Sequence, residues 1–317
     1  MSWPVQSIAR DGTATFRTET YPVQTITLTR EQLFAGTGQG NPAVTISGTL
    51  SLPVTRSERV PAVLLLHGDA GQLGNQAVWT ERLNALGIAV FNLDSFSARG
   101  GVAKGASTAS LPETLAGAAR IVDAERALAL LAAHPRIDAA RIALMGVSSG
   151  GRTTLLAAQT RFATAYGPPG LRFAAYIALY PPCNIRLIDD TRAQPGPLRI
   201  FIGEADPVTT AESCVRYVAR LRAAGVDAAV QTFPGAAHGF DNPNAGLTRI
   251  AGFPSTGKCD LEEIDGGRLV NADTRRALAD GDACIGSGLV AGRDDAADKA
   301  THEAVSALLI ERFHLAH

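Results

Sequence analysis

The sequence is short of the features that mark nucleic-acid-binding and membrane-spanning proteins. Its lysines are Lys104, Lys258 and Lys299, its formal net charge is −1, and aromatic residues make up 6% of its 317 residues. It has no basic block and no basic–aromatic interleaving that would follow a phosphate backbone. No apolar run is long enough to cross a bilayer. We therefore expect neither a nucleic-acid partner nor a membrane span.

Sequence signatures of cofactor and metal sites are missing too. The chain has neither the G-x-G-x-x-G turn of dinucleotide-binding folds nor the G-x-x-x-x-G-K-[ST] loop of P-loop proteins. It also lacks C-x-x-C pairs and cysteines interleaved with histidines, the spacing that a structural zinc site uses. We expect no nucleotide cofactor and no metal.

What is present fits one large enzyme domain. Hydrophobic residues make up 46% and charged residues 19% of the chain, close to an ordinary soluble enzyme. Its 317 residues slightly exceed the usual size of a single core, so one domain over 1–317 with an appendage is favoured over two equal domains. Either a monomer or a homodimer fits this size.

Strand-like and helix-like segments alternate over most of the chain. Residues at about 15–53 favour two antiparallel edge strands, at 15–28 and 42–52. Apolar runs predict buried strands at 61–66, 88–93, 173–179, 198–202 and 228–233, with one more run ending at Gly146. Helical patterns lie at 76–86, 115–133, 150–161, 208–224 and 299–313. The alternation predicts an α/β fold, with a mostly parallel twisted sheet covered by helices on both faces.

Residues at about 242–298 break this alternation. The segment is rich in Gly, Asp and Asn, shows no periodicity and contains two cysteines. We expect an irregular insertion before the C-terminal helix.

The four cysteines, Cys183, Cys214, Cys259 and Cys284, all lie in the second half of the chain. They allow three pairings. A Cys259–Cys284 disulfide would order a segment that lacks an apolar core, and Cys183 with Cys214 is the accompanying pair. Two disulfides favour an oxidising compartment, the periplasm or the exterior. The first residues, Met1-Ser-Trp-Pro, lack the basic start and apolar run of a signal peptide, so none is expected in this chain.

The clearest chemical motif is Gly146-Val147-Ser148-Ser149-Gly150. An apolar run precedes it and a helical segment follows, so Ser148 is expected on a strand-to-helix turn, the nucleophile elbow of serine hydrolases. Glycine is needed on either side because a side chain would collide in so tight a turn. The alternative is a Gly/Ser loop without chemistry.

A serine nucleophile needs a base, and the base needs an acid that orients it. Catalytic groups of α/β sheets gather at the carboxyl ends of strands. Asp206 follows one predicted strand and His238 follows the next, which gives the chain order Ser, Asp, His of α/β hydrolases. Glu204 and Asp241 are alternatives for the acid.

The loop after the first buried strand, His67-Gly68-Asp69-Ala70-Gly71, is a candidate for the oxyanion hole. In this arrangement one donor is the backbone N–H of the residue after the nucleophile, Ser149, and the second comes from that loop, from Asp69 or Gly68. His67 is expected to hold the loop through its ring.

Arg99 is a candidate of another kind, in the stretch D-S-F-S-A-R-G. A guanidinium could bind a substrate carboxylate through two parallel hydrogen bonds. A loop arginine is otherwise a solvated or structural partner.

Five motifs carry a resemblance to a known family: L-L-L-H-G at 64–68, L-D-S-F at 93–96, A-L-M-G-V-S-S-G-G at 143–151, G-E-A-D at 203–206 and P-G-A-A-H-G-F-D at 234–241. They resemble the dienelactone hydrolase family of the α/β-hydrolase superfamily. The resemblance implies the α/β-hydrolase fold and the roles of nucleophile, acid and base for Ser148, Asp206 and His238. The dienelactone-cleaving members carry a cysteine nucleophile and a glutamate in the loop after the first core strand. With Ser148, the chain is similar to the broader group of carboxylesterases.

Together these features predict a serine hydrolase that cleaves carboxylic esters or lactones through an acyl-enzyme. Its substrate would be a small molecule. One alternative is a peptidase or amidase of the prolyl-oligopeptidase type, which usually brings a large additional domain. Another is a catalytically silent α/β-hydrolase fold that serves as a binding module. Because 242–298 follows His238, we hypothesise that this segment lies near the pocket mouth and limits substrate size.

Overall fold

The structure, a computed structural model, describes residues 16–54, 58–99 and 120–315, and an eight-stranded sheet forms its centre. The strands lie in the order β1-β2-β4-β3-β5-β6-β8-β9. Their bounds are β1 (Phe16–Ile26), β2 (Ala43–Pro53), β3 (Val60–Leu66), β4 (Ala89–Asp94), β5 (Ile137–Val147), β6 (Tyr176–Leu179), β8 (Leu198–Gly203) and β9 (Ala228–Phe233). From β4 to β9 all neighbours are parallel, whereas β2 is antiparallel to β1 and β4. The predicted mostly parallel sheet with an antiparallel N-terminal edge is confirmed.

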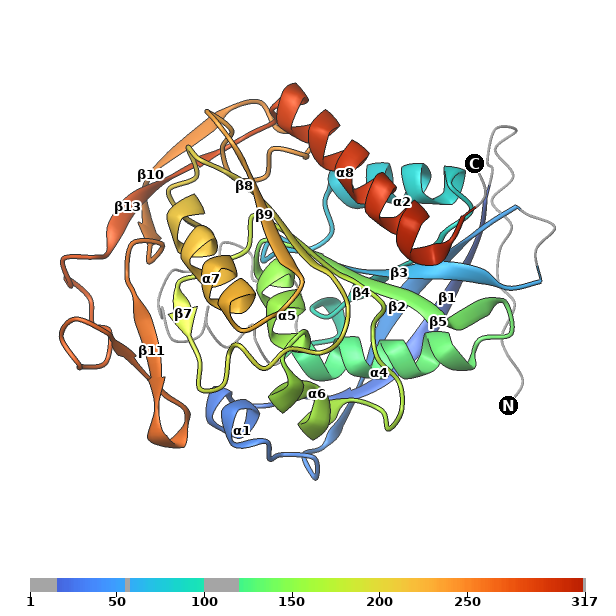
Figure 1. Ribbon diagram of the computed structural model, residues 1–317, viewed down its shortest axis with the longest axis horizontal. Coiled ribbons are helices and arrows are strands. Elements are labelled where there is room, and N and C mark those ends of the chain that lie inside the picture. Colours follow the sequence, from blue (N-terminus) through green and yellow to red (C-terminus); the bar gives the residue numbers. More distant parts are fainter. Residues whose placement is uncertain (1–15, 55–57, 100–119, 316–317) are drawn as a thin grey trace.

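Helices cover both faces of this sheet (Figure 1). Their bounds are α1 (Arg30–Ala35), α2 (Gly74–Ala85), α4 (Arg120–Ala133), α5 (Ser149–Ala157), α6 (Thr160–Tyr166), α7 (Ala211–Ala223) and α8 (Asp295–Phe313), with short 3₁₀ turns η1 (Ser97–Arg99) and η3 (Asp265–Gly267). Figure 1 shows α2 and α8 together on one face and α4, α5 and α6 on the other. None of the helices described here is long and apolar enough to cross a membrane.

The middle of the sheet is the apolar core. All seven residues of β3 are buried, because a central parallel strand has a helical layer on each side. The strand β5 next to it is buried from Ile142 to Val147. This rigid centre presents the carboxyl ends of its strands at one edge, which is where the sequence places the candidate catalytic residues.

Local structure departs from the sequence-based prediction at α1 and within the predicted helix 150–161. The six-residue helix α1 was not predicted, although Thr29 and Gln32 form a reciprocal capping box at its start. The helix predicted over 150–161 is divided into α5 and α6, because the backbone at Gln159 is extended and pairs with Ala193. Residues 115–119 of the predicted helix 115–133 lie outside the described residues.

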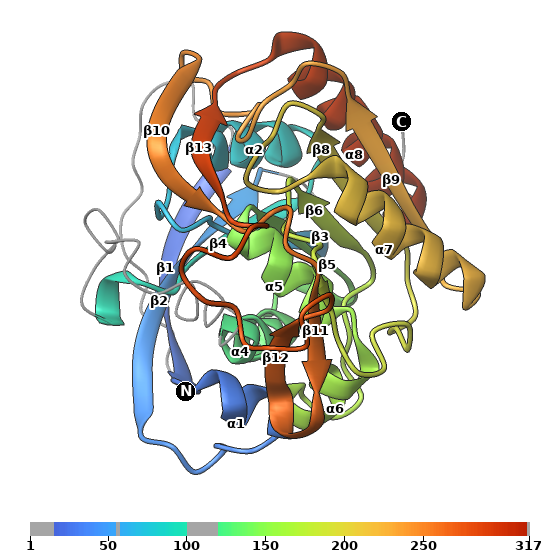
Figure 2. The same cartoon turned by 90° about the vertical axis from the view of Figure 1, so that its left-hand side faces the viewer.

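The segment at 242–298 was wrongly predicted as irregular. It contains four strands, β10 (Thr248–Ser255), β11 (Leu261–Ile264), β12 (Arg268–Asn271) and β13 (Gly286–Ala291). Strands β10 and β13 form a two-stranded ribbon, and β11 and β12 form a hairpin that adds β7 (Ile185–Arg186) in parallel. In Figure 2 the β10–β13 ribbon lies above and to the left of α5, and β11 and β12 lie below it. Each of these strands pairs with a strand that is separated from it by a loop or by a long stretch of chain. No local alternation of apolar and polar residues therefore reveals it in the sequence.

Both expected disulfides are present. Cys183 is bonded to Cys214 and Cys259 to Cys284. The first bridge joins the loop after β6 to α7. The second joins the chain just after β10 to the chain just before β13, so it closes the hairpin β11–β12 into a covalent loop.

Candidate active site

Ser148 lies on a strained turn between β5 and α5. Its backbone has φ 54° and ψ −118°, a conformation that a residue other than glycine rarely adopts. A Cβ atom at Gly150 would lie 2.5 Å from the carbonyl oxygen of Leu66 and 2.6 Å from that of His67, and one at Gly146 would overlap the backbone of Gly150. Only glycine therefore fits around the serine, as the motif predicts.

The structure brings Ser148, His238 and Asp206 together from three strand ends. The distance from Ser148 Oγ to His238 Nε2 is 2.9 Å, and that from His238 Nδ1 to Asp206 Oδ2 is 2.6 Å. Both are hydrogen-bond distances. The imidazole thus bridges the hydroxyl and the carboxylate, with one ring nitrogen for each.

Asp206 is held in place by its own loop. Its Oδ1 accepts the backbone N–H groups of Val208 at 2.8 Å and Thr209 at 3.0 Å, and its Oδ2 accepts the Thr209 hydroxyl at 2.5 Å. The alternative acid Glu204 instead accepts a hydrogen bond from Thr232. The structure therefore places Asp206, and not Glu204, against His238.

Charge and hydrogen bonding shift the pKa values of His238 and Asp206 in opposite directions. Burial acts to lower the pKa of His238, but the charge and hydrogen bond of Asp206, with weaker contributions from Asp69 and Asp241, raise it above the ordinary histidine value. Burial acts to raise the pKa of Asp206, yet His238 and Thr209 hold it below the ordinary value. A carboxylate beside a strengthened base is the arrangement that general-base catalysis uses.

A second buried acid, Asp241, lies behind the histidine. Its oxygens accept hydrogen bonds from the Tyr180 hydroxyl at 2.7 Å, from Trp79 Nε1 at 2.8 Å and from Asn75 Nδ2 at 3.3 Å. The ring of Tyr180 meets the ring of His238 edge-on, with centroids 4.8 Å apart. Asp241 thus supports the face of the imidazole through Tyr180. Tyr180 directly follows a predicted strand, so the strand-end rule could have singled it out.

The candidate oxyanion hole lies beside the serine. A Cβ atom at Gly68 would be 3.2 Å from the Ser148 Cβ, so the loop of Gly68 and Asp69 passes next to Ser148. His67 Nδ1 donates to the Gly68 carbonyl at 2.7 Å, and its Nε2 accepts the Ser95 N–H at 3.3 Å. Burial lowers the pKa of His67 to about 4. This histidine is a neutral structural clamp of the loop, the role expected for it.

Arg99 does not offer a free guanidinium to a substrate. It forms a two-point ion pair with Asp123, at 2.7 and 2.8 Å. Its other three N–H groups donate to the Thr27 hydroxyl and to the carbonyl oxygens of Ser95 and Ile26. The predicted role of binding a substrate carboxylate is wrong because every donor of the side chain is already used within the fold.

Arg120, at the start of α4, was missed by the sequence analysis. It is only 3% exposed, and it donates to the His67 carbonyl at 2.7 Å and to Ser149 Oγ at 3.3 Å. The available signal was a charged residue directly before the apolar pair Ile121–Val122 in the predicted helical stretch.

The segment 242–298 forms backbone hydrogen bonds with the loop of His238. The His238 N–H donates to the Val290 carbonyl at 3.1 Å, and the Gly292 N–H donates to the His238 carbonyl at 3.0 Å. At the other strand of the ribbon, the Ser255 hydroxyl donates to the Pro207 carbonyl in the loop of the acid. The ribbon β10–β13 therefore contacts both the loop of His238 and the loop of Asp206.

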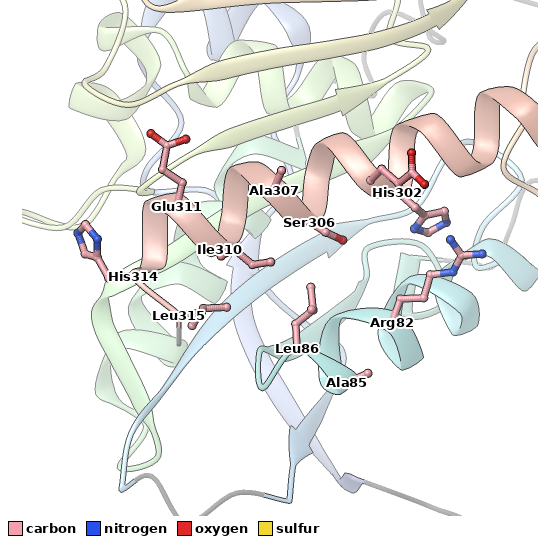
Figure 3. A pocket seen from close by; sticks show the side chains of 11 residues that line it. Arg82, Ala85, Leu86, His302, Ser306, Ala307, Ile310, Glu311, His314 and Leu315 are labelled. Carbon is pink, nitrogen blue, oxygen red and sulfur yellow. The ribbon is translucent and has the colours of Figure 1, made fainter. Parts of the chain in front are cut away.

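A groove of about 960 Å³ lies elsewhere, between α2 and α8. Figure 3 shows Leu86, Ile310 and Leu315 along it, with Arg82 and His302 at one end. No residue that lines it belongs to the cluster of Ser148, so it is separate from the candidate active site. No group of three or more His, Cys, Asp or Glu side chains in the described ranges is placed to hold a metal ion.

A model of the dienelactone hydrolase family matches residues 46–256, two thirds of the chain. The match begins in β2 and ends after β10, so it includes Ser148, Asp206 and His238. No curated protein sequence matches the chain.

Solved structures of the same fold are similar over nearly the whole chain. A dienelactone hydrolase-like promiscuous phosphotriesterase from metagenomic libraries is 18% identical, with a TM-score of 0.60, covering 93% of this chain and 98% of its own. Esterase 2 of Thermogutta terrifontis, in a structure described as phosphorylated by paraoxon, is 17% identical, with a TM-score of 0.57, covering 86% of this chain and 92% of its own. At these identities the likeness concerns the fold.

Proposed function

The chain belongs to the dienelactone hydrolase family, and from that premise we propose that it is a serine hydrolase that cleaves carboxylic esters or lactones through an acyl-enzyme. One observation carries this proposal: the hydroxyl of Ser148, on the elbow, lies 2.9 Å from His238 Nε2, whose other ring nitrogen lies 2.6 Å from Asp206. A serine hydroxyl becomes a nucleophile when a positioned base takes its proton.

The proposed reaction has two halves. In the first, His238 Nε2 takes the Ser148 proton while Oγ attacks the ester carbonyl, and the proton then passes from His238 to the leaving alcohol. In the second, His238 takes a proton from water, the hydroxide attacks the acyl carbon, and Ser148 regains its proton as the carboxylic acid leaves. Asp206 accepts the Nδ1–H of His238 throughout and offsets the charge of the imidazolium.

In both halves a negative charge develops on the carbonyl oxygen. The N–H of Ser149 is the first candidate donor for this oxygen, and an N–H of Gly68 or Asp69 is the second. The strained backbone at Ser148 supports this assignment, because it holds the hydroxyl clear of α5 while the next N–H starts the helix.

Replacing the nucleophile tests the proposal. Ser148→Ala should lower kcat on a small p-nitrophenyl ester by about 10⁴-fold or more, and a fluorophosphonate probe should label the wild type but not the variant. Ser306→Ala, on α8 away from the site, is the matched control and should behave as the wild type. Retention of most activity by a folded Ser148→Ala protein would overturn the proposal, and a wild type that neither turns over esters nor reacts with the probe would favour a binding module. A peptide panel beside the ester panel distinguishes an amidase.

The two disulfides support a location in an oxidising compartment, such as the periplasm or the exterior. Production of the protein in an oxidising and in a reducing compartment, followed by thiol titration, tests this. Free thiols with unchanged folding in the protein from its native host would contradict it.

The hypothesis that 242–298 limits substrate size also stands as a proposal. The hairpin β11–β12 can be excised cleanly, because the Cα atoms of Cys259 and Cys284 are only 4.9 Å apart and a short glycine linker can replace residues 260–283 while β10 and β13 stay. The shortened enzyme should accept longer acyl chains. An unchanged chain-length profile in a folded, active variant would count against the hypothesis.

A further inference from the structure

Arg120 lies under the loop that forms the candidate oxyanion hole. Its Nη2 donates to the His67 carbonyl at 2.7 Å, its Nη1 donates to Ser149 Oγ at 3.3 Å, and its guanidinium carbon lies 5.0 Å from the centre of the Phe96 ring. His67 and Ser149 are the residues on either side of the place where the substrate oxyanion would form. The side chain of Arg120 therefore contacts both segments that supply the candidate donors, the loop of His67 and the start of α5.

In the part of the chain that the structure describes, the buried charge of Arg120 has no ion-pair partner, and Asp69 and Asp123 attract it only from farther away. Among the described residues no carboxylate lies within ion-pair distance of it, and the nearest turn of α4 offers Asp123, whose two oxygens are taken by Arg99. The Nε atom is buried without a hydrogen-bond partner. Burial lowers the pKa of Arg120 to about 10, so the side chain is still a cation at neutral pH. A buried cation of this kind destabilises the folded protein. Buried charges of this kind cluster at functional sites, where their electrostatic field acts on the reaction.

The positive charge of Arg120 acts on the donors of the candidate oxyanion hole. The carbonyl of His67 belongs to the same peptide group as the Gly68 N–H, and a hydrogen bond to the carbonyl of a peptide strengthens its N–H as a donor. Repulsion by Arg120 also helps keep His67 neutral, so that its Nε2 continues to accept the Ser95 N–H while its Nδ1 donates to the Gly68 carbonyl. A positive charge in a dry site favours the oxyanion of the transition state far more than the neutral ester.

We propose that Arg120 is the electrostatic positioning residue of the oxyanion hole: it orients Ser149 and the His67–Gly68 peptide and stabilises the charge of the tetrahedral intermediate. It acts through these two groups and does not touch the substrate. The inference rests on the proposed function, since it needs an oxyanion to stabilise.

Two substitutions separate charge from packing. Arg120→Met removes the charge and keeps much of the volume, and Arg120→Lys keeps a charge but loses the two-point contact. For Arg120→Met we expect kcat on a p-nitrophenyl ester to fall by about 10- to 100-fold with KM nearly unchanged. The inhibition constant of a phenylboronic acid, which binds as a tetrahedral anion on the serine, should rise by the same factor. Arg120→Lys should recover part of both losses.

Arg161→Met is the matched control, because Arg161 pairs with the buried Glu263 and contacts none of the catalytic residues named here. It should lower the melting temperature and leave kcat and boronate binding within about twofold. The proposal is overturned if Arg120→Met loses melting temperature alone, if its loss falls only on KM, or if Arg120→Lys is as impaired as Arg120→Met. If Arg120→Met does not fold, Arg120→Gln takes its place, and equal boronate affinity in Arg120→Gln and wild type overturns the proposal.

Failure of the proposed function gives a different result. In that case the probe does not label Ser148 of the wild-type protein, so the missing reaction cannot be attributed to Arg120. With labelling intact, the Arg120 variants report on the oxyanion hole alone.

Discussion

The disulfide Cys259–Cys284 couples the stability of the β10–β13 ribbon to the position of His238. It closes a loop with a sequence separation of 25 residues. In the chain-entropy model, opening a loop of that length gives the unfolded chain about 3.5 kcal/mol of extra freedom at 25 °C. A typical domain is stable by only about 5–15 kcal/mol, so the double variant Cys259→Ser/Cys284→Ser should lose a large part of the free energy of unfolding.

The same substitution should also reduce activity. Strand β13 forms hydrogen bonds with the backbone on both sides of His238, and a displacement of a catalytic group by about 1 Å lowers the rate by up to about 10²-fold. We expect kcat of Cys259→Ser/Cys284→Ser to be about tenfold lower than wild type at a temperature where the variant is folded. Urea unfolding, followed by the fluorescence of the buried Trp79, gives the stability, and a p-nitrophenyl ester gives kcat.

The other disulfide is the control. Cys183–Cys214 has a sequence separation of 31 residues, so its removal should cost about the same free energy of unfolding, but neither cysteine lies at the ends of β13. A Cys259→Ser/Cys284→Ser variant as stable as the wild type would refute the entropic reasoning. Normal kcat despite the loss of stability would refute the idea that β13 holds the histidine.

Two further predictions concern buried acids. Asp241→Asn removes one of the charges that raise the pKa of His238. Since the proposed base, His238, must be neutral to take a proton, the acidic limb of the kcat/KM profile should move to lower pH. Tyr180→Phe, which keeps the carboxylate, should move it less. An acidic limb unchanged by Asp241→Asn would mean that this carboxyl group is neutral. Burial raises the pKa of Glu125 from 4.5 to about 8, so the folded protein favours the protonated carboxyl group. The free energy of unfolding is therefore highest below pH 4.5 and falls as the pH rises to about 8, by at most about 5 kcal/mol. Glu125→Gln should therefore unfold at higher urea than wild type at pH 9 and nearly equally at pH 5; an equal difference at both pH values would contradict the buried-charge argument.

The α/β sheet and the candidate triad were largely accessible from the sequence. Strands such as 61–66 are continuous apolar runs, and a run buried on both faces can be recognised without its neighbours. The order Ser148, Asp206, His238 follows from the rule that the carboxyl ends of parallel strands meet at one edge. The acid remained open between three residues in the sequence, because Glu204, Asp206 and Asp241 all lie near strand ends.

The small strands of 242–298 and the role of Arg99 were not accessible in the same way. Leu261 pairs with Ile185 across 76 positions of the chain, and a strand of four residues leaves too little pattern to detect. Arg99 matched the expectation for a ligand of carboxylates, and it does bind one, but the carboxylate is that of Asp123 on α4. Which charged groups meet is decided by packing, because opposite charges attract at any sequence separation.

By itself the sequence determined the parallel sheet, the elbow that needs glycine at 146 and 150 and the order of the candidate triad, since each of these depends on local pattern or on the edge where strands end. It left three pairings of the four cysteines open. Only the tertiary structure decided which carboxylate meets His238, how the β10–β13 ribbon binds the loop of His238, how the cysteines pair, and where the buried Arg120 lies beside the candidate oxyanion hole. These depend on contacts between segments that are far apart in the chain. Arg120 shows the difference most clearly: in the sequence it is one arginine of many, and in the fold its guanidinium donates to the His67 carbonyl and to the Ser149 hydroxyl, next to Ser148.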